Sequence, residues 1–291
     1  MTETDRLRVT FWGVRGSTPC AGEQYARYGG HSSCVAVEHN GEPAVLFDLG
    51  TGLTPYGEAL GGAADPFHGI VLLTHLHWDH VQGLPFFTPL HNPASTLEVY
   101  GPRQDGDFET VWDGLMSPPY FPIRARDLPG HTEWHGVGDD SFAAGEAAKV
   151  TSRFVRHVGA TLGFRLDWHG ASVVYISDHS QGCDPELDDH VPAEVLDLCD
   201  GADLVIHDAQ HTQSEFEQKR HWGHCTYEYA LHVAREAGAR QVALFHHDPA
   251  HGDDDVDRIL LATQERSAAL DGPDVVAAWE GLTIDLPTRT R

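Results

Sequence analysis

Basic residues are scarce in this chain of 291 amino acids. Lys and Arg together number 19 against 44 Asp and Glu, the formal net charge is -25, and Lys149 and Lys219 are the only lysines. A field of this sign repels polyanions at long range, and no cluster of basic residues interrupts it. The composition therefore argues against an extended nucleic-acid-binding face, and we interpret the acidic excess as a solubilising surface.

Long apolar runs and a secretion signal are also missing. No stretch reaches the length of a membrane span, and residues 1–6 carry acids where a signal peptide needs a basic and then an apolar region. Five cysteines are scattered without a C-x-x-C pair, which favours free thiols over a disulfide framework or a cysteine zinc site. We therefore expect a cytoplasmic protein without membrane partners.

The chain is long enough to bury a substantial core. Apolar and alternating runs predict strands at 7–12, 34–38, 44–47, 70–73, 97–100, 150–155, 161–166, 172–176, 204–206, 241–245 and from 275 onward. Helical periodicity predicts helices over 226–237 and 256–270, whereas 101–145, rich in Pro, Gly and aromatic residues, looks irregular. Because no linker or repeat is visible, we expect one α/β domain over residues 1–291, with sheets inside and helices outside.

One histidine-rich stretch, THLHWDH at 74–80, follows a short apolar run. At the end of an extended segment, residues two apart point the same way, so His75 and His77 can converge on one point. Asp79 and His80 follow as the chain enters the next element. Imidazoles and a carboxylate at this spacing suit zinc, manganese or iron. The alternative is a His-rich surface turn in a chain with 21 His, and the strand context disfavours it.

Further candidates stand directly after other predicted strands, namely His157, Asp178 and His246. A single His or Asp at a strand end is usually a turn residue, but strand ends that return to one place are where the remaining ligands should lie. Asp48 ends another strand beside glycines, where a carboxylate either supports a ligand histidine or caps the turn. The glycine-bearing turn 13–19 either holds a phosphate or, more simply, connects two strands.

With these motifs the chain resembles the metallo-β-lactamase superfamily, and within it the ribonuclease Z-like and cyclic-nucleotide phosphodiesterase-like hydrolases. The resemblance extends over nearly the whole chain, in the segments 11–19, 47–52, 74–80, 157–163, 175–178, 207–210, 222–226 and 244–249. It implies an αββα sandwich of two mixed β-sheets flanked by helices, with the site at one edge of the sheets. The His-x-His-x-Asp-His motif is specific for the superfamily but not for the substrate.

The resemblance implies two divalent metal ions. It assigns His75, His77 and His157 to one ion, Asp79, His80 and His246 to the other, and Asp178 to a bridge between them. Zinc is the expected metal because imidazoles dominate this set, and Mn2+ or Fe2+ also fits a site with two carboxylates and no thiolate. A homodimer is expected from the resemblance alone.

A histidine–acid pair is implied as the proton donor. In ribonuclease Z-like relatives such a pair protonates the leaving alkoxide, and the matching residues are His224 and Asp208, beside the catalytic Asp79. The alternative for His224 is a cap on the helix that begins near residue 226. Asp48, His207 and His247 are expected to support the ligands from behind. The remaining histidines without a partner pattern are expected at the surface: His39, His91, His169, His190, His232 and His251.

Two departures from the relatives bear on the substrate. Ribonuclease Z typically has Glu where Asp208 stands, and it carries a Gly/Pro-rich arm for transfer RNA that this sequence lacks. We therefore favour a phosphodiesterase that attacks a small or cyclic nucleotide-type phosphodiester with a metal-bridging hydroxide. The alternatives are a transfer-RNA 3′-processing endonuclease, a non-catalytic metal-binding sensor, and a thioester, lactone or β-lactam hydrolase. The segments around His207 and His224 disfavour the last of these.

Overall fold

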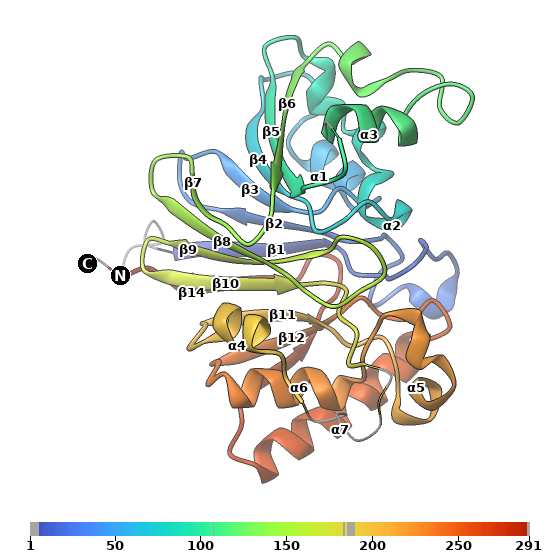
Figure 1. Cartoon of the computed structure of the whole chain (residues 1–291), viewed down its shortest axis with the longest axis vertical. Coiled ribbons are helices and arrows are strands. Elements are labelled where there is room, and N and C mark those ends of the chain that lie inside the picture. Colours follow the sequence, from blue (N-terminus) through green and yellow to red (C-terminus); the bar gives the residue numbers. More distant parts are fainter. Residues whose placement is uncertain (1–5, 107, 183, 185–189, 290–291) are drawn as a thin grey trace.

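Two seven-stranded mixed sheets pack against each other in the computed structural model, which describes residues 6–106, 108–182, 184 and 190–289 (Figure 1). The first sheet has the order β14-β1-β2-β3-β4-β5-β6. Its strands are β1 (Arg6–Gly13), β2 (Cys34–Glu38), β3 (Ala44–Phe47), β4 (His68–Leu72), β5 (Thr96–Pro102), β6 (His131–Val137) and β14 (Thr283–Pro287).

The second sheet has the order β13-β12-β11-β10-β9-β8-β7. Its strands are β7 (Ser141–Ala144), β8 (Ala148–Phe154), β9 (Leu162–Trp168), β10 (Ala171–Ile176), β11 (Leu204–Asp208), β12 (Gln241–Phe245) and β13 (Asp274–Ala277). The pairings from β3 to β6 and from β10 to β13 are parallel, and the other pairings are antiparallel.

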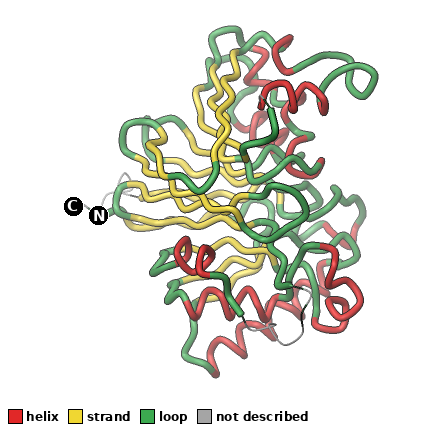
Figure 2. The backbone as a smooth tube through the Cα atoms, in the orientation of Figure 1, coloured by secondary structure: helices red, strands yellow, loops and turns green. Residues whose placement is uncertain are grey.

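Helices cover the outer faces of both sheets (Figure 2). They are α1 (Leu53–Ala59), α2 (Trp78–Val81), α3 (Phe108–Leu115), α4 (Ala193–Cys199), α5 (Gln213–Lys219), α6 (Tyr227–Glu236) and α7 (Asp253–Ala269). Helices α1 and α3 pack on the first sheet, and α4, α6 and α7 pack on the second. The predicted sandwich of two mixed sheets flanked by helices is confirmed.

Aromatic side chains join the two sheets in the middle of the sandwich. Phe47 of β3 and Tyr175 of β10 stack with ring centroids 4.7 Å apart, and Tyr175 also contacts Phe245 of β12 edge-on. All three are completely buried. Burial of such large rings dominates the energetics of a core, so these contacts fix how the two sheets sit on each other.

The carboxyl ends of the parallel strands meet at one edge of the sandwich. Strands β3, β4, β10, β11 and β12 all end there, because side-by-side parallel strands present the same ends together. In Figure 1 this edge lies on the right, with α2 and α5, away from the chain termini. Segments that are distant in the sequence are thereby brought together.

The segment 101–145 is more regular than predicted. It contains α3, β6 and β7 besides the end of β5, so the expectation of an irregular region was wrong. β6 and β7 each lie at one edge of their sheet, and the residues of β6 are mostly exposed or half-buried. An edge strand needs no apolar run, which explains why the pattern did not reveal it.

Two expectations from composition are tested by the described residues. None of their helices has both the length and the apolar character needed to cross a membrane. Cys20, Cys34, Cys199 and Cys225 are free thiols, as predicted, and the fifth cysteine lies outside the described residues.

Candidate metal centre

The THLHWDH stretch leaves β4 in an extended conformation and turns into the single-turn helix α2. His77 has φ -65° and ψ 150°, and α2 begins at the next residue. The rings of His75 and His77 consequently face the same point, with centroids 4.4 Å apart. Asp79 and His80 lie inside α2 and are buried.

A first group of donor atoms comes from His75, His77, His157 and Asp178, all within 4.8 Å of one another. Nε2 of His157 lies 3.3 Å from Nδ1 of His77 and 3.5 Å from Oδ2 of Asp178. Nε2 of His75 lies 3.7 Å from the same carboxylate oxygen. These atoms converge from the ends of β4, β8 and β10.

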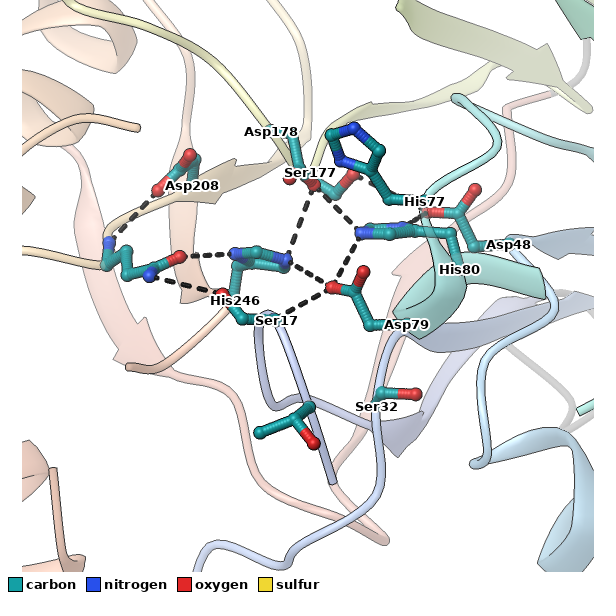
Figure 3. A network of polar contacts seen from close by, with 12 residues as sticks. Ser17, Ser32, Asp48, His77, Asp79, His80, Ser177, Asp178, Asp208 and His246 are labelled. Carbon is teal, nitrogen blue, oxygen red and sulfur yellow. Dashed lines mark hydrogen bonds and ion pairs between the residues drawn. The ribbon is translucent and has the colours of Figure 1, made fainter. Parts of the chain in front are cut away.

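A second group comes from Asp79, His80 and His246 (Figure 3). Oδ2 of Asp79 lies 3.1 Å from Nε2 of His80 and 3.1 Å from Nε2 of His246. His246 directly follows β12 with a φ of 60°, a left-handed conformation that is uncommon outside glycine and often marks functional positions.

Asp178 joins the two groups. Its Oδ2 faces the first group, whereas its Oδ1 lies 3.1 Å from Nε2 of His80 and 3.4 Å from Nε2 of His246 (Figure 3). Each carboxylate oxygen therefore belongs to one group, which is the arrangement required of a bridging ligand.

Three of the donor atoms lack the hydrogen bonds that buried polar atoms normally make. Among the described residues, Nε2 of His75, Nε2 of His80 and Oδ1 of Asp178 are buried without a hydrogen-bond partner. Leaving such atoms unpaired is costly, and shared cations would satisfy them. Separations of 3.1 to 3.7 Å also suit ligand atoms that each lie about 2.0–2.2 Å from a common ion. The residues present fit two divalent metals.

The other ring nitrogen of four candidate ligands is held by the protein. The contacts are His75 Nδ1 to Thr74 Oγ1 (3.0 Å), His80 Nδ1 to Asp48 Oδ2 (2.7 Å), His157 Nδ1 to Gly223 O (2.7 Å) and His246 Nδ1 to Gln210 Oε1 (2.9 Å). Such contacts orient a ligand histidine and set its tautomer. In these four histidines the Nε2 atom is thereby left free to face the other donor atoms.

Asp48 is the centre of this outer support. Besides His80, its carboxylate accepts hydrogen bonds from the backbone N–H of Thr74 at 2.8 Å and from the hydroxyl of Tyr175 at 2.9 Å. It is completely buried at the end of β3. The position that was predicted either to support a ligand or to cap a turn therefore contacts a candidate ligand directly.

The glycine-bearing turn after β1 also contacts the centre. The backbone N–H of Ser17 donates to Oδ2 of Asp79 at 2.8 Å, and a Cβ on Gly16 would lie 2.4 Å from Nδ1 of His246. Arg15 is completely buried and donates to the carbonyls of Gly29 and His251. The turn thus positions the ligands, and its arginine is not presented to a phosphate.

Ionisation in the centre follows from burial and from neighbouring charges. Burial holds the pKa of His75 well below its ordinary value and also lowers the pKa of His157. Burial opposes ionisation of Asp178, but the imidazoles of His246 and His80 outweigh it and hold the pKa of the carboxyl well below its usual range. Neutral imidazoles and an ionised carboxylate are the forms that bind metals.

His80 is the exception among the ligands. Burial disfavours its charged form, but Asp79, Asp178 and Asp48 surround it and raise its pKa well above the ordinary value. Three buried carboxylates without a countercharge draw a proton onto the nearest imidazole. A divalent cation would satisfy the same carboxylates and displace that proton.

His224 and Asp208 form a pair beside the two donor groups. Nδ1 of His224 lies 2.8 Å from Oδ2 of Asp208, and the backbone N–H groups of His179 and Gln210 donate to the same carboxylate at 3.0 Å. Burial opposes protonation, but the carboxylate of Asp208 raises the pKa of His224 to about 9. The hydroxyl of Thr226 caps α6 instead, so the alternative of His224 as the helix cap was wrong.

A cavity of about 480 Å³ is lined by His224 and by residues of both donor groups. Its wall includes His77, Asp79, His157, Asp178, His224 and His246, together with the rings of Trp78 and Trp222. Among the described residues, neither Lys nor Arg lines it. A ligand in this cavity therefore meets acid, imidazole and indole groups, and any phosphate charge would need bound cations.

Some predicted histidines lie apart from the donor groups. Nε2 of His247 contacts the carbonyl of Ala278 at 2.9 Å, and burial beside Arg15 lowers its pKa to about 3. Nε2 of His207 lies 3.2 Å from Nδ1 of His179 rather than near a ligand.

The expectation that His251 lies at the surface was wrong. It is buried, and its Nε2 lies 2.9 Å from Oε1 of Glu215. His39 and His169 lie nearer to the surface and are half-buried, and both contact the carboxylate of Glu42.

Sequence reasoning missed Gln210 and Gly223 as supporting residues. Gln210 follows β11 two residues after Asp208, so its place at a strand end was the available signal. Gly223 contributes only a carbonyl, and nothing in an amino-acid type marks such a role.

The comparisons with known proteins agree with this geometry. Residues 46–247 match the family model described as a Beta-lactamase superfamily domain, and the chain belongs to the metallo-β-lactamase superfamily. A curated relative named Ribonuclease Z, from Halobacterium salinarum, is 28% identical, and the alignment covers 97% of this chain and 98% of that protein.

Two solved structures share the fold. The short form of human tRNase Z has a TM-score of 0.68 at 21% identity, covering 96% of this chain and 99% of that one. A diphosphatase from the PhnP family has a TM-score of 0.69 at 18% identity, covering 98% and 99%. The predicted resemblance to metal-dependent hydrolases of this superfamily, with nuclease-like relatives, is confirmed.

Proposed function

We propose that this protein is a two-metal phosphodiesterase for a small or cyclic nucleotide-type phosphodiester. One observation carries the proposal: the cavity lined by residues of both donor groups, which Asp178 joins, is also lined by a histidine held by an acid. A hydrolase of diesters needs both features, because a phosphodiester carries negative charge and expels a strongly basic alkoxide.

His75, His77 and His157 would hold one ion, Asp79, His80 and His246 the other, and Asp178 would bridge them. When bound, two divalent ions supply an activated water at neutral pH and stabilise the charge that develops on the phosphoryl oxygens. Zinc fits the imidazole-rich donor set, and Mn2+ or Fe2+ fits its carboxylates.

His224 supplies the proton to the leaving oxygen. Its Nδ1 is engaged by Asp208, so the proton on Nε2 is the one directed into the cavity. Because its pKa is raised to about 9, the imidazole carries that proton at neutral pH. Asp208, held ionised by His224, keeps the ring oriented after the proton has left.

A transfer-RNA 3′-processing endonuclease is the second candidate, since the curated relative covering nearly the whole chain is named Ribonuclease Z. Against it stand the net charge of -25 and the cavity wall without Lys or Arg among the described residues. A polynucleotide gains most of its affinity from phosphate contacts with basic side chains. We therefore keep the smaller diester as the favoured substrate.

The test is a substrate panel at matched metal occupancy: bis-p-nitrophenyl phosphate, cyclic nucleotides, dinucleotides and a transfer-RNA precursor. Turnover of the small diesters, lost in His224→Gln but retained in the exposed control His91→Gln, supports the proposal. Cleavage of the precursor alone would favour the endonuclease. Metal-loaded protein that turns over neither diester nor precursor would support a thioester, lactone or β-lactam substrate, or a sensor.

A further inference from the structure

We propose that Trp78 and Trp222 form a stacking subsite on either side of the reacting phosphate, which selects diesters that carry flat aromatic groups such as nucleobases. Trp78 stacks on the group that stays on phosphorus, and Trp222 stacks on the group that leaves. This inference rests on the phosphodiesterase activity proposed above, and it names the substrate class for the same site.

Both rings are unusually exposed for tryptophan. Trp78 is 75% exposed and Trp222 is 53% exposed, although large aromatic side chains normally bury most of their surface. Both line the same 480 Å³ cavity as the candidate ligands. Exposed aromatic surface in a polar cavity marks a place where a ligand is expected to cover it.

The chain places each tryptophan next to residues of the reacting site. Trp78 stands between His77 and Asp79, candidate ligands of the two different ions, at the first position of α2. Trp222 ends the short 3-10 helix Arg220–Trp222 and lies two residues before His224. Since His224 protonates the leaving oxygen, the ring nearest to it in the chain is assigned to the leaving group.

A lysine contacts the Trp222 ring. Nζ of Lys219 lies 5.2 Å from the ring centroid, within the range of a cation–π interaction, and 3.1 Å from Oδ2 of Asp248. The ammonium therefore contacts both the carboxylate of Asp248 and the indole of Trp222. These two contacts restrict the motion of the indole at the cavity wall.

The charge of the cavity also favours stacking as the means of recognition. Neither Lys nor Arg stands in the described part of the cavity wall, so the wall offers a second phosphate no permanently positive side chain. Base–aromatic stacking is independent of charge and tolerant of base identity. A short diester with one or two aromatic groups suits this wall better than a chain of phosphates does.

Two substrates with the same leaving group separate the roles of the tryptophans. Thymidine 5′-(p-nitrophenyl phosphate) retains a base on phosphorus, whereas methyl p-nitrophenyl phosphate retains only a methyl group. Trp78→Ala should lower the ratio of their kcat/KM values by about 5- to 100-fold, the effect of removing one stacked ring. Trp222→Ala should lower kcat/KM for both substrates and leave the ratio unchanged.

Matched variants complete the design. Trp78→Phe and Trp222→Phe should restore most of the loss, and Trp279→Ala, an exposed tryptophan outside the cavity wall, should change neither substrate. Calorimetry measures the affinity of each metal-loaded variant for thymidine 5′-monophosphate and so tests the subsite without turnover. This affinity should fall in Trp78→Ala.

Failure of the stacking subsite and failure of the proposed phosphodiesterase activity give different results. An unchanged ratio and unchanged thymidine monophosphate binding in Trp78→Ala, with both diesters still hydrolysed, overturn the stacking subsite and leave the phosphodiesterase standing. Unaltered hydrolysis of both diesters by Trp222→Ala overturns its assignment to the leaving group. Absence of hydrolysis of both diesters by the metal-loaded wild-type chain refutes the proposed function itself.

Discussion

Nδ1 of His224 lies 2.8 Å from Oδ2 of Asp208, at the wall of the cavity that holds the candidate metal ligands. The imidazole stacks on that of His246, with ring centroids 5.1 Å apart and ring planes inclined by 26°. The ring is thus held beside the donor groups by a buried carboxylate, which is the arrangement that the proposed role of proton donor requires.

Replacement of His224 by Gln should lower kcat about 10²- to 10⁴-fold for a diester with a poor leaving group, such as a dinucleotide. The loss should be much smaller with p-nitrophenolate, which leaves without a proton. The comparison of the two substrates by steady-state kinetics checks this. Equal losses on both would assign His224 to a role other than proton donation.

The pH profile should have an alkaline limb no higher than about pH 9, because the pKa of His224 is raised to about 9 and bound cations can only lower it. The stability that this pair contributes is fully present below about pH 6.5, the ordinary pKa of histidine, and is lost as the pH rises through the raised pKa, where the imidazole releases its proton. In Asp208→Asn the limb should move to lower pH. A limb that stays in place in this variant would contradict the assignment.

The sequence predicted more of the candidate site than of the fold's edges. His157, Asp178 and His246 each follow a predicted strand, and the structure brings their donor atoms together at one edge of the sandwich, as expected. The edge strands β6 and β7 were missed because one strand neighbour and an exposed face leave no apolar run. Gln210 was missed because its contact with His246 depends on packing between β11 and β12.

Asp48→Asn tests the support behind His80. The amide keeps the shape but loses an acceptor and its charge, so affinity for the metal should fall about 10- to 100-fold. The free energy of unfolding of the metal-free protein should fall by about 1–3 kcal/mol, because Tyr175 and Thr74 also lose a charged acceptor. Chelator competition and urea unfolding measure the two effects.

The control for this variant is Asp254→Asn, because the side chain of Asp254 is 87% exposed and pairs with Arg27 at the surface. It should change metal affinity little and stability by less than about 1 kcal/mol. If Asp48→Asn behaves like this control, Asp48 does not support the centre.

Gly16→Ala should damage the centre without replacing any candidate ligand. The added methyl would lie 2.4 Å from Nδ1 of His246, so the imidazole must shift and metal content and activity should both fall. Gly114→Ala in α3 is the control, since nothing lies within 4 Å of the new Cβ there. Elemental analysis and turnover are the measurements, and full metal content in Gly16→Ala would show that His246 is not held where the turn places it.

The most direct test of the two-metal centre is the metal content of the purified chain beside that of Asp178→Ala, measured by elemental analysis after dialysis. The account predicts two transition-metal ions per wild-type chain and no more than one in the variant, because both donor groups share that carboxylate. A wild-type chain without stoichiometric metal, or a variant that retains both ions, would contradict it.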